Sequence, residues 1–138
     1  MIPQPYTEAD ALTFVRGESP GAPEDSFAIT AGDEVVGAIG LSLNSLKYKG
    51  TTGYWVEASA RGRGICTRAL RVLSRWALDE LELQRLDLIT DRDNVASQRC
   101  AERVGFRREG VLRAHLRHPD GRIRDSVMFS LLPGELLE

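Results

Sequence analysis

The feature that most constrains this chain is a glycine-bearing turn between a predicted strand and a predicted helix. Residues 52–57 are β-type, and the segment Arg61–Ala69 leads into the longest amphipathic helix pattern of the sequence. Such a turn leaves several backbone N–H groups unpaired and pointing the same way, and the helix dipole adds to their field. This geometry suits a phosphate or pyrophosphate. An ordinary strand-to-helix turn is the alternative that this stretch alone leaves open.

Composition narrows the classes of function. The 138 residues fit a single domain over residues 1–138, and the net charge of -2 gives no basic excess for nucleic acid. No apolar run is long enough to span a membrane and no signal-peptide pattern is present. The two cysteines, Cys66 and Cys100, form neither a CxxC motif nor a metal-ligand spacing. We therefore expect reduced thiols, a cytoplasmic protein and no metal.

The hydrophobic spacing predicts the element order α-β-β-β-α-β-α-β-β. Helices are predicted over residues 7–16, 64–81 and 95–104, with a loop over 17–25. Strands are predicted over residues 26–30, 35–43, 52–57, 85–90, 106–117 and 123–132. The inward face of the second helix is expected to carry Ile65, Ala69, Val72, Leu73, Trp76 and Ala77.

Four short motifs occur along the chain in a fixed order. They are Gly53-Tyr54-Trp55, Arg61-Gly62-Arg63-Gly64-Ile65, Asn94-x-x-Ser97 and Gly105-Phe106-x-x-Glu109-Gly110. Each motif alone is weak, but their order and spacing together resemble the Gcn5-related N-acetyltransferases (GNAT), and most closely the RimJ/RimL-type branch that acetylates ribosomal proteins. The resemblance covers about residues 5 to 133 and implies a mixed, mainly antiparallel sheet flanked by helices.

In that family the glycine turn cradles the pyrophosphate of acetyl-coenzyme A (acetyl-CoA). The resemblance therefore implies acetyl-CoA as the acetyl donor. It assigns coenzyme contacts to Val56, Arg61, Gly62, Arg63, Gly64, Ile65, Cys66, Thr67, Asn94 and Ser97. Cys66 stands where the family usually has Gly or Ala, and we expect it to be a packing residue rather than a nucleophile. Asn94 is equally well explained as a helix N-cap.

Two departures from the family pattern matter. We expect the family's first strand and helix to be missing, which would expose a sheet edge that a homodimer could cover. Many members also carry a tyrosine acid at the position of Ala101, whereas the branch that this chain resembles places Ser97 near the coenzyme sulfur.

The base for amine deprotonation is the least defined part of the predicted site. We assign catalytic roles to Ser97, which contacts the sulfur, and to Glu57, which takes the proton directly or through a water. A solvated Glu57 with proton loss to solvent is the alternative. His115 lies on a strand that is expected to flank the acceptor pocket, and Glu109 and Asp125 are candidates for its entrance.

The sequence thus predicts an N-acetyltransferase that moves an acetyl group from acetyl-CoA to a primary amine by direct attack. The amine would belong to a protein N-terminus or a small molecule. The alternative is a non-catalytic coenzyme-A-binding sensor or partner module on a shortened fold. A nucleotide hydrolase is disfavoured because Gly62-x-Gly64 lacks the Gly-Lys-Ser/Thr ending of a P-loop.

Overall fold

The computed structural model describes residues 25–138. The helix predicted over residues 7–16 and the loop up to residue 24 lie outside this range. The strands are β1 (Asp25–Ala31), β2 (Glu34–Leu43), β3 (Lys49–Val56), β4 (Arg85–Asp91), β5 (Arg107–Arg117) and β6 (Ile123–Leu131). The longer helices are α2 (Ile65–Arg75) and α3 (Val95–Val104), and Ala58–Ala60 forms a short 3₁₀ turn.

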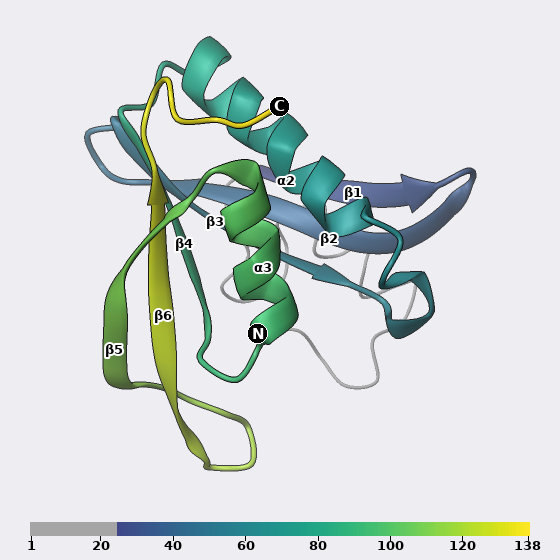
Figure 1. The fold of residues 1–138 in the computed structure, drawn as a ribbon, viewed down its shortest axis with the longest axis vertical. Coiled ribbons are helices and arrows are strands. Elements are labelled where there is room, and N and C mark those ends of the chain that lie inside the picture. The colour runs from purple at the N-terminus through teal and green to yellow at the C-terminus, as the bar shows by residue number, and fades with distance from the viewer. Residues whose placement is uncertain (1–24) are drawn as a thin grey trace.

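The six strands form one sheet in the order β1-β2-β3-β4-β6-β5. All neighbouring strands are antiparallel except β3 and β4, which are parallel. A parallel pair needs a crossover connection, and α2 provides it. Figure 1 shows α2 and α3 together on one face of the sheet. The mixed, mainly antiparallel architecture expected from the sequence is confirmed.

The element boundaries follow the local sequence signals closely. Helix α3 has the predicted bounds. It stops at Gly105, whose φ of 113° is adopted without strain by a residue that has no Cβ atom. Helix α2 ends earlier than predicted, at Arg75, and continues as a π-helical turn over Trp76–Glu80. The N–H of Leu81 closes that turn on the Trp76 carbonyl at 3.2 Å.

The buried face of α2 differs from the prediction. Leu70, Leu73 and Ser74 are buried in the helix, whereas Val72 is 67% exposed. The buried positions are spaced by three and four residues, so the contact stripe is rotated toward Leu70. Trp76 lies outside this stripe and meets the Phe27 ring edge-on, with the ring centroids 5.4 Å apart.

Strands β3 and β4 separate halfway along their length, and this separation positions the site. Their parallel register runs only from Lys49 opposite Arg85 to Thr52 opposite Leu88. Beyond it, β3 continues to Val56 and pairs with β2 alone, while β4 continues beside β6. The carboxyl ends of β3 and β4 therefore open a gap in the sheet, next to the start of α2.

Strand β1 has a neighbour on one side only within residues 25–138. A hollow of about 650 Å³ lies between β1 and α2 and is lined mainly by apolar side chains, including Phe27, Ile29, Val72 and Trp76. An open edge was expected here, and the homodimer that would cover it stays a prediction. In the described part of the chain, every helix is too short or too polar to cross a membrane.

Candidate active site

The first turn of α2 has the backbone geometry of an anion site. Gly64 adopts a left-handed conformation with φ 72°, and among the described residues no side chain caps the helix. The first regular helical hydrogen bond here runs from the Arg68 N–H to the Gly64 carbonyl at 3.1 Å. The N–H groups of residues 65–67 precede that bond, so they are available to a ligand at the positive end of the helix dipole.

The N-terminus of α3 has a side-chain cap, whereas the N-terminus of α2 has none among the described residues. The Asn94 side-chain oxygen accepts a hydrogen bond from the Ser97 N–H at 3.1 Å. Asn94 is therefore a helix N-cap, as the plainer interpretation of the sequence expected. The contrast with α2 makes the turn at Gly64 the better anion site of the two.

Two arginines border the uncapped turn. The Nε atom of Arg61 donates to the Val56 carbonyl at 2.9 Å, which fixes the guanidinium at the end of β3. Its remaining N–H groups can still bind a phosphate. Arg63 is exposed between Gly62 and Gly64, which both have positive φ. The turn therefore offers positive charge beside free backbone donors.

Val56 contributes its backbone to the gap between β3 and β4. The neighbouring Glu57 N–H points toward β2, where it donates to the Val36 carbonyl at 2.7 Å. Because N–H directions alternate along a strand, the Val56 N–H points to the opposite edge, toward the gap. Val56, for which a coenzyme contact is predicted, thus presents a backbone N–H toward the gap, whereas the Glu57 N–H is bonded to β2.

Tyr54 and Ser97 join the end of β3 to the first turn of α3. The Tyr54 hydroxyl lies 3.0 Å from Ser97 Oγ and donates to the Ser97 carbonyl oxygen at 3.3 Å. Burial, with smaller effects from Cys66 and Cys100, raises the pKa of Tyr54 far above its usual range, so the hydroxyl keeps its proton. The sequence places Tyr54 in a short motif on a β-type segment and carries no signal for this contact with Ser97.

The two cysteines meet beside that pair. Cys66 Sγ, in the first turn of α2, lies 3.2 Å from Cys100 Sγ in α3. The Thr67 hydroxyl is also directed at Cys100 Sγ, at 3.7 Å. Cys66 is half-buried and Cys100 is buried. The predicted packing role of Cys66 is compatible with this position, but the close thiol pair was not foreseen.

Glu57 lies where β3 ends, as predicted. It is half-buried, and its carboxylate accepts a hydrogen bond from the Ser59 hydroxyl. That hydroxyl orients the carboxylate without adding charge. Glu57 directly follows Val56, whose N–H points into the gap. Its assignment as the base remains a prediction.

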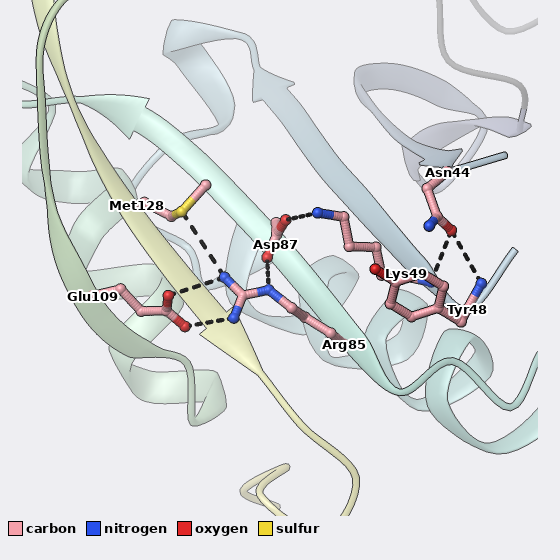
Figure 2. Close-up of polar contacts among 7 residues, drawn as sticks. All are labelled: Asn44, Tyr48, Lys49, Arg85, Asp87, Glu109 and Met128. Carbon is pink, nitrogen blue, oxygen red and sulfur yellow. Dashed lines mark hydrogen bonds and ion pairs between the residues drawn. The ribbon is translucent and has the colours of Figure 1, made fainter. Parts of the chain in front are cut away.

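The other acidic candidates already have partners in the structure. Glu109 accepts two hydrogen bonds from the Arg85 guanidinium, at 2.8 and 3.0 Å, and these bonds hold its pKa below the usual range. Figure 2 shows the Arg85 side chain lying between Glu109 and Asp87. Asp125 accepts from the Ala114 N–H at 2.8 Å. Both carboxylates therefore already have hydrogen-bond partners, and neither is free to bind an incoming amine.

His115 likewise has a partner: its Nδ1 atom lies 3.0 Å from the Ser126 hydroxyl. This contact holds the imidazole against the β5–β6 ladder, where Leu112 pairs with Ser126. In contrast, side-chain contacts of Tyr54, Cys66 and Cys100 connect the end of β3, the first turn of α2 and the first turns of α3. The coenzyme residues assigned from the sequence belong to these three segments and to the residues just before α2 and α3.

Comparison with known proteins gives a consistent picture. The family model described as Acetyltransferase (GNAT) domain matches residues 1–107. YdaF from Bacillus subtilis (strain 168) is 38% identical over 94 residues, which is 68% of this chain and 51% of that protein. The ribosomal-protein-serine acetyltransferase of Escherichia coli (strain K12) is 34% identical over 88 residues, covering 63% of this chain and 49% of that protein.

Among solved structures, Mycobacterium smegmatis RimJ in complex with CoA-disulfide superposes with a TM-score of 0.76 at 29% identity. The match covers 90% of this chain and 60% of that one. The chain spans about half the length of the two curated relatives.

Proposed function

This chain belongs to the GNAT acetyltransferase family, and we propose that it transfers the acetyl group of acetyl-CoA to a primary amine by direct attack. The observation that carries the proposal is the uncapped first turn of α2, which follows Gly64 and faces the opening between β3 and β4. An anion and an extended ligand arm can be bound there by backbone groups alone.

The residues of the turn fit the coenzyme's pyrophosphate. The N–H groups of Ile65, Cys66 and Thr67 supply donors, and Arg61 and Arg63 supply charge. The coenzyme would bring an activated acetyl thioester to the gap in the sheet. The similarity to RimJ, whose structure contains CoA-disulfide, supports a coenzyme ligand for this chain.

The chemical roles follow from what borders the gap. The Val56 N–H donates to the acetyl oxygen as negative charge develops on it. Ser97 Oγ donates its proton to the departing sulfur, and the Tyr54 hydroxyl, 3.0 Å away, holds Ser97 Oγ in position. Glu57 accepts the proton of the attacking amine, directly or through a water. Ala101 has no side-chain donor that could act as the acid. Tyr54 instead supports Ser97 in that role.

The acceptor class in this proposal is a primary amine on a peptide or a small molecule. The ribosomal-protein-serine acetyltransferase relative supports the peptide class. A suitable test measures thiol release from acetyl-CoA with a panel that contains short peptides with free N-termini and small amines. We expect at least one amine to accelerate thiol release in a concentration-dependent way.

Variants connect this turnover to the site. Ser97→Ala is expected to lower kcat by about tenfold to a hundredfold with little change in coenzyme affinity, because it removes a proton donor. Tyr54→Phe should have a smaller effect of the same kind. Ser45→Ala, in an exposed turn, is the matched control and should leave turnover unchanged. Coenzyme binding without turnover on any amine would favour the non-catalytic binding module instead.

A further inference from the structure

The Cys66–Cys100 pair is a cluster of nucleophilic side chains that the proposed transfer does not use. The two residues are 34 positions apart in the sequence, yet their sulfurs lie 3.2 Å apart across the α2–α3 contact. A disulfide requires a sulfur separation of about 2.0 Å, so the sulfurs need to approach by roughly 1.2 Å. Small side-chain rotations in two adjacent helices can supply such a movement.

The groups around the two cysteines favour the thiolate form of Cys100. Hydrogen bonds from Cys66, Tyr54 and Thr67, together with the charge of Arg103, lower the pKa of Cys100 to about 6. The hydrogen bond to Cys100 and burial raise the pKa of Cys66. The two sulfurs therefore share a hydrogen bond, and Cys100 is the thiol of the pair that ionises more readily.

The two cysteines differ in access to solvent. Cys66 is half-buried in the first turn of α2, whereas Cys100 is 4% exposed. A small oxidant therefore meets Cys66 first, and Cys100 lies within reach behind it. An accessible thiol next to a second thiol that can resolve it is the arrangement of a reversible redox site.

We propose that Cys66 and Cys100 form a redox-active dithiol that a hydroperoxide converts into an intramolecular disulfide linking α2 to α3. This inference does not depend on the acetyl transfer, because it rests on the two sulfurs and their neighbours. The cross-link would fix the first turn of α2 to α3.

The step balances with the peroxide as the oxidant. The Cys66 sulfur attacks one peroxide oxygen, and the proton of its thiol passes to the departing peroxide oxygen. The O–O bond breaks, water leaves, and Cys66 becomes a sulfenic acid. The Cys100 thiolate then attacks the Cys66 sulfur and the S–O bond breaks. The departing oxygen takes a proton from solvent, which replaces the proton that Cys100 lost on ionising, and leaves as a second water. Two thiols and one hydrogen peroxide give one disulfide and two waters.

The test treats the reduced full chain with hydrogen peroxide at neutral pH and follows free thiols and intact mass. The wild type should lose both thiols and two hydrogen atoms, remain a single chain on a non-reducing gel, and regain both thiols with dithiothreitol. In Cys100→Ser, oxidation should stop at the Cys66 sulfenic acid, which adds one oxygen atom to the intact mass, because the resolving thiol is then absent.

Cys66→Ser and Cys100→Ser are the matched controls, and neither should show the loss of two hydrogen atoms. Circular dichroism identifies a variant that fails to fold, and the wild-type mass measurement stands without either variant. The proposal is overturned if both thiols stay free under conditions that oxidise free cysteine. It is also overturned if oxygen atoms are added at both sulfurs, or if the disulfide links two chains.

Discussion

The buried hydroxyl of Tyr54 is the residue that connects the elements of the candidate site. Its raised pKa keeps the hydroxyl protonated, and the hydroxyl contacts Ser97 and interacts with Cys100. A hydroxyl that contacts both residues fixes the first turns of α3 against β3. Hydrogen bonds between segments that are distant in sequence therefore hold the site together.

The thiol pair gives a pH prediction at the residue scale. The ultraviolet absorbance of thiolate should rise by one thiolate per chain with a midpoint at about pH 6, because Cys100 is lowered to that value. The thiolate is present above this pH and lost below it. The second thiol should ionise only at alkaline pH, since the pKa of Cys66 is raised.

Cys100→Ser is the control for this titration. The remaining thiol of that variant should ionise near its ordinary pKa of about 8.5 or above. Two wild-type thiols that both titrate near the ordinary value would contradict the assigned hydrogen bonds.

Single-residue roles were only partly predictable. Asn94 could be recognised as a cap because a cap is a local signal, four residues or fewer in extent. The Tyr54–Ser97 contact spans 43 positions and the thiol pair spans 34. Contacts of this kind depend on strand register and helix rotation, which a single sequence does not specify.

At the scale of elements, the β2–β3 pair is held unusually close by Gly37. A Cβ atom on Gly37 would lie 2.3 Å from the Trp55 carbonyl oxygen. Gly37→Ala should therefore lower the free energy of unfolding by about 2 kcal/mol, since the two backbones must separate. Urea denaturation followed by circular dichroism measures the change.

Gly53→Ala is the matched substitution on the facing strand. A Cβ at Gly53 meets nothing within 4 Å and its φ is not positive, so its effect should stay within about 0.5 kcal/mol. Equal destabilisation by the two alanines would show that the close approach at Gly37 does not limit the packing.

Most elements could be predicted because their signals are local. The spacing of apolar residues and Gly105 sufficed for α3, and the β4 bounds differ by one residue from the prediction. The face of α2 was predicted less well, since Val72 borders a hollow while Leu70 enters the core. The irregular register of β5, where Ala114 has φ 49°, had no signal in the alternation of residues.

At the scale of the whole molecule, the gap in the sheet, the uncapped helix and the two arginines meet at one place. The fold places the parallel β3–β4 pair in the middle of an otherwise antiparallel sheet, and α2 begins at its open end. The motif order in the sequence predicted this junction through its resemblance to a family. The β3–β4 ladder ends at Thr52 opposite Leu88, and this end creates the opening. Its position could be found only from the structure.

The central claim is that acetyl-CoA binds at the first turn of α2, and titration calorimetry with acetyl-CoA tests it most directly. The wild type should bind one equivalent, and Arg61→Ala should raise Kd about tenfold by removing a charge-assisted contact. Arg108→Ala, which removes the same charge from exposed β5, should leave Kd unchanged. No binding by the wild type, or equal Kd values for the wild type and Arg61→Ala, would contradict the account.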